Sequence, residues 1–410
     1  MPHSDDVRIL RDLAKQVADL AASPVQGERR ELWRAHNSFE RTRPLIICGW
    51  EAAWPEHPQA ANQCEDPFFQ NYETVFKRAI FRETLGDDTI LEPWATVRAA
   101  VVSPPNGPWG VTHSTTHSGV QGGSWKHKPP LQELSDLDKM VVPRHEINEQ
   151  ATAASVTKLQ EAIGDILPIT VDRSPLWTGW WADISTALFY LRGLDQFMLD
   201  MSDNPQWLHQ LLSFMSEGIL KSQDEAEAAG DWSLINGGNQ AMCYSRELPD
   251  PAANVYGVQR AQLWDFCAAQ EYALVSPRHH DEFLLQYQLP IIEKFGLSAY
   301  GCCEDLTRKI DMLRQIKNLR RIAVTPMADP AKCAEQIGTD YIISWRPNPA
   351  DMICCGFYPD KIKRLVREAM EAMKGCHVDV HLKDVQTVGK QPELLREWVR
   401  IVRAITDEYA

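Results

Sequence analysis

The stretch LSAYGCCEDLTRKIDMLRQIKNLRRIAVT, residues 297–325, decides the predicted fold. It begins with a short apolar run over 297–301 and continues with helix-like spacing over 305–317. It ends in a second apolar run over 321–325. A buried strand, a helix and another buried strand in this order predict one βαβ unit with parallel strands.

The same alternation extends in both directions along the chain, with helix-like segments between most of the apolar runs. The predicted strands cover residues 45–50, 96–103, 167–171, 233–236, 297–301, 321–325, 341–345 and 377–382. Eight such units predict a mixed α/β fold of the (β/α)₈ TIM-barrel type. No GxGxxG sequence follows a predicted strand, which disfavours a dinucleotide-binding sheet.

We expect one barrel domain over residues 1–410, because no internal repeat, low-complexity tract or linker divides the sequence. Helix-like apolar spacing in the first part of the chain predicts an N-terminal helical extension over residues 1–40. Residues 104–130 are rich in Gly, Ser, Thr and His, and predict a long lid-like loop.

The composition favours a soluble cytoplasmic enzyme. An excess of acidic over basic residues gives a net charge of −14, which disfavours binding to nucleic acid or to an anionic membrane. No window approaches the ~18 apolar residues of a membrane span, and no secretion signal is recognisable at the N-terminus. The 10 cysteines are therefore expected to be reduced thiols. Assembly into a homodimer is a general expectation for such enzymes.

The segment YGCCEDL, residues 300–306, is the strongest candidate site. Its two thiols and its carboxylate lie where a strand leads into a helix, and a helix N-terminus lowers the pKa of a thiol. Cys302 and Cys303 can act as nucleophiles or, together with His381 of the last strand, form a donor set that zinc accepts. Alternatively, both cysteines are small packing residues, and Glu304 is an ordinary acid in the first turn of a helix. A second adjacent pair, Cys354–Cys355, is expected to be structural.

Other polar and aromatic residues end the predicted strands, where a barrel carries its active site. In HLKDVQT, residues 381–387, Lys383 and Asp384 follow the last strand, although a solvated turn is an alternative. The tryptophans around 177–181 can form an aromatic wall for a methyl-bearing ligand or can pack in the core. The predicted catalytic residues are Glu304 and Asp384, and the predicted substrate contacts are Trp177, Trp181, Asn236, Trp345 and Lys383.

Three segments resemble the uroporphyrinogen-decarboxylase superfamily. Residues 183–219 resemble its helix, Asp-x-Pro-type turn and second helix, with DNP at 203–205. Residues 300–350 and 378–399 resemble a branch related to corrinoid-dependent methyltransferases. Decarboxylases of the superfamily carry an Arg-Gln-Ala-Gly-Arg motif at the first strand, whereas this chain has CGWEAAW at 48–54. Porphyrinogen decarboxylation is therefore disfavoured.

The resemblance implies a (β/α)₈ barrel, a zinc ion acting as a Lewis acid, and methyl transfer to the cobalt of a separate corrinoid protein. Related alkyl-transfer enzymes hold zinc with a His-x-Cys pair and a distant cysteine. Here the matching strand end is Tyr300-Gly301-Cys302-Cys303, which lacks that histidine. By resemblance, Cys302 or Cys303 is one ligand, and the candidates for the others are His381, Glu304 and Asp384.

The leading hypothesis is therefore a corrinoid-dependent methyltransferase that demethylates a small O- or N-methylated compound. Zinc would polarise the leaving heteroatom and a nearby acid would protonate it. One alternative is a decarboxylase-like lyase that acts on a carboxylated small molecule without a metal. Another is a non-catalytic barrel that binds a ligand or a corrinoid protein.

Overall fold

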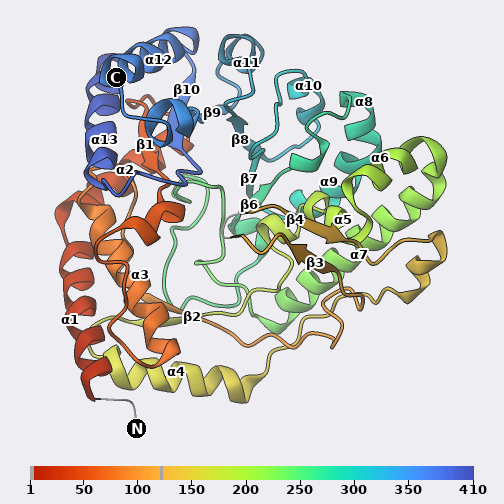
Figure 1. Ribbon diagram of the computed structural model, residues 1–410, viewed down its shortest axis with the longest axis horizontal. Coiled ribbons are helices and arrows are strands. Elements are labelled where there is room, and N and C mark those ends of the chain that lie inside the picture. The colour runs from red at the N-terminus through yellow and green to blue at the C-terminus, as the bar shows by residue number, and fades with distance from the viewer. Residues whose placement is uncertain (1–3, 121–122) are drawn as a thin grey trace.

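Six parallel strands form the main sheet of the computed structural model, which describes residues 4–120 and 123–410 (Figure 1). Their order across the curved sheet is β1-β10-β9-β8-β7-β6. The strand bounds are Leu45–Cys48 (β1), His377–Leu382 (β10), Ile342–Trp345 (β9), Leu319–Val324 (β8), Leu297–Tyr300 (β7) and Trp264–Cys267 (β6). The parallel register, with Ile46 opposite Val380 at the β1 edge, confirms the predicted parallel strands. The helix-like segment predicted over 305–317 is helical only over Ile310–Leu313.

Two further strands, β2 (Ala95–Arg98) and β5 (Ile169–Asp172), pair with each other in parallel, with Ala95 opposite Ile169. Within the described part of the chain, no ladder of hydrogen bonds joins this pair to the edges of the main sheet. The sheets are thus a six-stranded half-barrel and a separate pair, and hydrogen bonding between strands does not close them into a ring.

The predicted strand at 233–236 is wrong. Of these residues, Ser233 alone pairs with another segment, in an isolated antiparallel bridge with Tyr256. The backbone N–H of Ser233 donates a hydrogen bond to Asn236 Oδ1 at 2.8 Å, so the chain bends here and does not continue as a strand. The strand that precedes β7 is β6, which sequence patterning missed. Its run WDFC contains Asp265, and a charged residue inside an apolar run conceals a buried strand.

Helices cover the outer face of the half-barrel (Figure 1). Their bounds are Ser4–Ala21 (α1), Pro24–Asn37 (α2), Pro67–Glu83 (α3), Glu149–Ile163 (α4), Ser185–Arg192 (α5), Leu194–Asp203 (α6), Pro205–Ala229 (α7), Pro277–His280 (α8), Gln286–Ile292 (α9), Ile310–Leu313 (α10), Pro330–Ile337 (α11), Pro359–Ala372 (α12) and Glu393–Thr406 (α13). Helices α1 and α2 agree with the predicted N-terminal extension. No helix in the described ranges is long and apolar enough to span a membrane.

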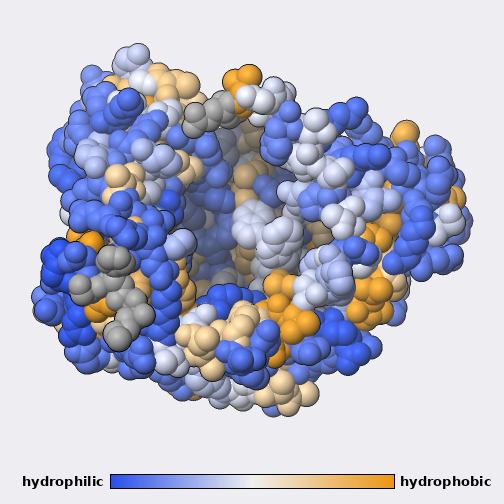
Figure 2. Space-filling model, turned by 60° about the horizontal axis from the view of Figure 1, so that its bottom comes forward, coloured by the Kyte–Doolittle hydropathy of each residue, from blue (hydrophilic) through white to orange (hydrophobic). Residues whose placement is uncertain are grey.

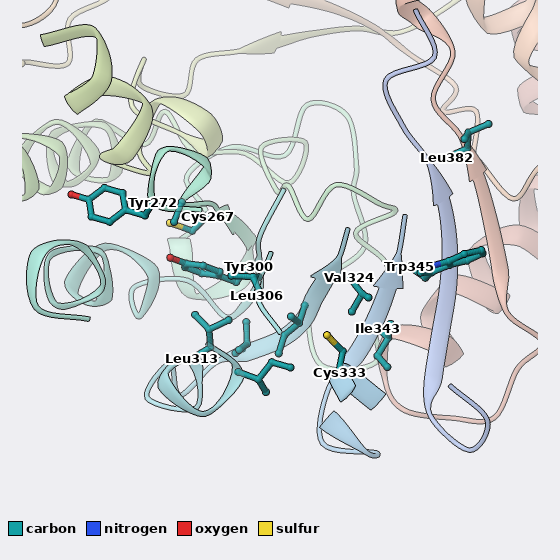
Figure 3. Packing of buried hydrophobic residues seen from close by; sticks show 14 of the residues in the cluster. Cys267, Tyr272, Tyr300, Leu306, Leu313, Val324, Cys333, Ile343, Trp345 and Leu382 are labelled. Carbon is teal, nitrogen blue, oxygen red and sulfur yellow. The ribbon is translucent and has the colours of Figure 1, made fainter. Parts of the chain in front are cut away.

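Alternate residues of each strand face opposite sides of the sheet. On β10, Val380 and Leu382 pack in the main hydrophobic core, which also contains residues of α12 and α13. Figure 3 shows part of this core, in which Leu382 and Trp345 lie at neighbouring strands. The intervening residues Asp379 and His381 are absent from this core and face the interior of the half-barrel. The inner face of β10 therefore carries titratable side chains.

The predicted loop over residues 104–130 contains an antiparallel hairpin of β3 (Ser114–His117) and β4 (Trp125–Lys128). Its strands are largely exposed, and residues 121–122 lie outside the described residues. The ring of His127 contacts the Tyr190 carbonyl at 2.7 Å, which anchors the hairpin on α5. A lid function for this segment stays a prediction.

Candidate active site

The ends of β7, β9 and β10 bring a thiol and two cations together. Lys383 Nζ donates a hydrogen bond to Cys302 Sγ at 2.9 Å. The guanidinium of Arg346 donates to the Cys302 carbonyl and, at 2.5 Å, to Gln240 Oε1. Gln240 comes from the loop after α7, and its Oε1 also lies 3.4 Å from Lys383 Nζ. This cluster of Cys302, Arg346, Lys383 and Gln240 is the centre of the candidate site.

A glycine turns the chain into this site. Gly301 follows β7 with a φ of +99°, a conformation that side chains other than glycine rarely adopt. A Cβ at this position would come within 2.5 Å of Leu306 Cδ1 and 3.1 Å of the Ala323 Cβ. The turn leaves Cys302 against a small apolar cluster with Phe266, Ala268 and Ala299.

Glu304 holds the loop from below. Its carboxylate is buried and accepts the backbone N–H groups of Cys302 and Ala269, each at 2.8 Å. These two bonds tie the end of β7 to the end of β6. The geometry therefore makes Glu304 a positioning residue for the thiol loop, whereas its predicted catalytic role stays a prediction.

The pKa values of the two adjacent thiols are shifted in opposite directions. Their sulfurs are 3.5 Å apart, and Cys302 is buried while Cys303 is exposed. The hydrogen bond from Cys303 lowers the pKa of Cys302 to about 6; burial opposes this effect, and the cations Arg346 and Lys383 add to it. The same hydrogen bond, together with burial, raises the pKa of Cys303. The thiolate form is therefore favoured at Cys302 and disfavoured at Cys303.

The predicted zinc ligands do not converge. His381 is buried on the inner face, where burial and then the cations Arg346 and Lys383 hold its pKa well below the usual value. Within residues 4–120 and 123–410, no three His, Cys, Asp or Glu side chains form a group that could hold a metal. Asp384 accepts a long contact from Cys303, with 3.9 Å between Oδ2 and Sγ. The donor set Cys302, Cys303 and His381 does not fit zinc in this arrangement.

The tryptophan that lies at the candidate site differs from the two that were predicted to contact the substrate there, Trp177 and Trp181. Trp177 is buried and packs on Trp109 with ring centroids 4.6 Å apart, so it belongs to the core. Trp181 is exposed. The indole at the site is that of Trp180, which has Lys383 Nζ 5.5 Å from its ring centroid and Phe266 at 4.9 Å. The predicted substrate contacts Trp177 and Trp181 therefore leave out the tryptophan of this run that lies beside Lys383.

Two other predicted substrate contacts lie elsewhere. Asn236 donates to Asp172 at 2.7 Å, in a polar cluster at the end of β5. Trp345 lies on the outer face of β9, in the main core. The structure therefore brings Cys302, Cys303, Lys383 and Asp384 together, and separates Asn236 and Trp345 from them.

The sequence predicts no role for Gln240, whereas it indicates that Arg346 can bind a carboxylate or a phosphate. Arg346 ends a predicted strand in SWRPNP, which was the available signal. Gln240 has a φ of +59° and follows the loop sequence NGGN, which carries no such signal. Gln240 Nε2 and Arg346 Nε are buried without a hydrogen-bond partner among the described residues. Figure 2 shows a deep hollow on one face of the molecule, lined largely by hydrophilic residues.

Comparisons with known proteins give little further guidance. No protein-family model matches the sequence, and no curated protein matches it. Among solved structures, the chain is similar to a methyltransferase from Methanosarcina mazei, with a TM-score of 0.46 and 15% sequence identity. The match covers 93% of this chain and 98% of that one. At this identity and TM-score, the likeness says nothing about substrate or activity.

Proposed function

We propose that this protein is a methyltransferase that moves a methyl group from a small O- or N-methylated compound to the cobalt of a corrinoid protein. The observation that carries the proposal is the 2.9 Å contact between Lys383 Nζ and Cys302 Sγ at the strand ends. Arg346 also binds Cys302, because its guanidinium donates a hydrogen bond to the Cys302 carbonyl. The segments that resemble corrinoid-dependent methyltransferases, 300–350 and 378–399, are those that supply these three residues.

The proposed chemistry needs a proton donor beside the leaving heteroatom. The bond between the methyl carbon and its oxygen or nitrogen breaks, and the heteroatom keeps the electron pair and takes a proton. Lys383 carries such a proton, and its contacts with Cys302 and Gln240 hold Nζ at the strand ends. The corrinoid of the partner protein supplies the nucleophile that receives the methyl group.

The neighbouring groups suit this task. The Cys302 thiolate balances the charge of Lys383, and Arg346 holds the backbone of Cys302 in place. The ring of Trp180 offers an aromatic face beside Lys383, against which a methylated aromatic or methylammonium group can pack. Zinc has no part in this proposal, because the predicted ligands do not converge.

The test combines the purified protein with a reduced corrinoid carrier protein and a panel of methoxyarenes and methylamines. Mass spectrometry then measures the demethylated product. We expect one class of donor to be consumed, and Lys383→Met to slow its consumption by about 100-fold. Lys363→Met is the matched control, because Lys363 lies on the exposed surface of α12, where it forms an ion pair with Asp360. Failure to demethylate any donor would refute the proposal.

A second candidate is the decarboxylase-like lyase. It is favoured by the buried Nε of Arg346 and Nε2 of Gln240, which have no partner within the described residues and can donate hydrogen bonds to a substrate carboxylate. This function predicts release of carbon dioxide from a carboxylated compound in the absence of any corrinoid carrier. Methyl transfer instead requires the carrier. Binding of a ligand without either reaction would favour the non-catalytic alternative.

A further inference from the structure

Cys302 and Cys303 form a pair of thiols in contact at the edge of the site. Their sulfurs lie 3.5 Å apart, and the exposed Cys303 gives the pair access to solvent. The ammonium of Lys383 lies 2.9 Å from Cys302 Sγ and favours its thiolate form. Redox-sensitive cysteines commonly combine an activated thiolate with solvent access and a second thiol close by.

The chain contains a second adjacent pair in a different environment. Cys354 and Cys355 end the short helical turn over Ala350–Cys354, after β9. Cys354 packs partly against the main core, and Cys355 is exposed. Among the described residues, no lysine or arginine donates a hydrogen bond to either sulfur, in contrast to Cys302. This pair has the same spacing without the cation.

We propose that Cys302–Cys303 is a redox-active dithiol, which hydroperoxides oxidise to a disulfide and small thiols reduce again. The Cys302 thiolate attacks a peroxide oxygen, so that an S–O bond forms and the O–O bond breaks. Lys383 supplies the proton with which the departing oxygen becomes water. Cys303 then attacks the sulfenic sulfur, the S–S bond forms, and the hydroxyl group leaves as a second water. Two thiols thereby lose two electrons and hydrogen peroxide gains them.

The product is easy to reverse. The Cα atoms of adjacent residues are about 3.8 Å apart, below the usual ~4.4–6.8 Å of disulfide-bonded cysteines, so the bond is strained and readily reduced. Its formation removes the negative charge beside Lys383. Oxidation would therefore reset the charge of the candidate site, whatever reaction that site performs.

The test treats the full chain with an equimolar amount of hydrogen peroxide at neutral pH and blocks remaining thiols with iodoacetamide. Trypsin then separates the two pairs, in the peptides 295–308 and 333–361. We expect peptide 295–308 to lose two hydrogen atoms and to escape alkylation, and dithiothreitol to restore its alkylation. In peptide 333–361, Cys354 and Cys355 should remain alkylated. Equal oxidation of both pairs, or addition of oxygen to 302–303 without loss of hydrogen, would overturn the proposal.

Two further variants separate the steps. Cys303→Ser removes the resolving thiol, so Cys302 should accumulate as a sulfenic acid that dimedone labels; Cys302→Ser should give no labelling at Cys303. Lys383→Met should slow oxidation by about tenfold at neutral pH, because the thiolate loses its neighbouring cation. An unchanged rate in Lys383→Met would contradict the assigned role of the cation. All these readouts are masses, and they do not depend on whether the protein transfers methyl groups.

Discussion

Two layers of charged side chains lie inside the half-barrel, at different heights along the same strands. In the lower layer, Asp379 on β10 accepts hydrogen bonds from Arg321 at 2.7 Å and from Ser344 at 3.0 Å, and contacts His36 of α2 at 3.3 Å. All four residues are buried. The upper layer is the strand-end cluster around Lys383 and Cys302, where Lys383 is only half-buried and Cys303 is exposed.

The difference lies in access to solvent, which the lower layer lacks and the upper layer has. The Asp379 carboxylate has partners on both oxygens and no access to solvent. Among the described residues, each layer keeps a buried donor without a partner, at Arg321 Nε below and at Gln240 Nε2 and Arg346 Nε above, but only the upper donors lie beside a half-exposed site. A buried charge is costly to leave unpaired, so a closed layer stabilises one arrangement of the strands. A layer with spare donors beside solvent can instead accept a ligand.

The largest expected effect comes from breaking the lower layer. Asp379→Asn leaves Arg321 buried without its counter-charge, and should lower the free energy of unfolding by about 3–5 kcal/mol. Urea denaturation followed by circular dichroism measures it. Asp360→Asn, on the exposed surface of α12, should change it by less than ~0.5 kcal/mol. A loss below ~1 kcal/mol for Asp379→Asn would remove the distinction between the layers.

The pH dependence of stability distinguishes Asp379 from Asp265, a buried acid on β6. Burial raises the pKa of Asp265 to about 7. Burial also raises the pKa of Asp379, but the interactions of this carboxylate with Arg321 and His36 outweigh the effect of burial and bring the pKa to about 2. Native Asp265 therefore holds a proton that the unfolded chain releases, and its contribution to stability is lost as pH rises from about 4 to 7. The contribution of Asp379 to stability is instead lost as pH falls from about 4 to 2.

The expected decrease in unfolding free energy from Asp265 is about 3 kcal/mol between about pH 5 and 8. Asp265→Asn should abolish this part of the decrease, as measured by urea titrations at the two pH values. If the variant shows the same pH dependence as the natural chain, Asp265 is ionised in both states.

Arg346→Met tests whether Arg346 belongs to the upper or to the lower layer. Arg346 is buried, yet its bonds go to the Cys302 carbonyl and to Gln240 in the upper layer. Their loss should lower the free energy of unfolding by about 1–3 kcal/mol, as scanning calorimetry would detect. Arg364→Met on the exposed face of α12 is the control. An effect as large as that of Asp379→Asn would assign Arg346 to the lower layer.

The smallest expected effect on stability belongs to Lys383→Met. Lys383 is half-buried, so its ion pair with Cys302 should contribute no more than about 1 kcal/mol to folding. The chemical consequence should be larger, because iodoacetamide should react more slowly with Cys302 at neutral pH when the cation is gone. A fall in unfolding free energy above ~2 kcal/mol would instead make Lys383 a structural residue like Arg321.

Sequence patterning succeeded where a local signal matches a local structure. The predicted strand 377–382 is β10 to the residue, and the predicted N-terminal helical extension over residues 1–40 contains α1 and α2. Patterning failed at β6, where Asp265 interrupts the apolar run, and at 233–236, where the Asn236 side chain competes with strand pairing. Each failure comes from a single polar side chain: Asp265 is buried within a strand, and Asn236 bonds the backbone of Ser233.

The sequence by itself determined the order of strands and helices, and which thiols and cations follow the ends of strands. It could do so because apolar periodicity and turn residues act over a few neighbouring positions. Only the tertiary structure decided that Lys383 faces Cys302 across 81 residues, that Gln240 joins them, and that Trp180 rather than Trp177 reaches the site. Those contacts depend on strand order and on the direction in which each loop turns, which no local pattern specifies.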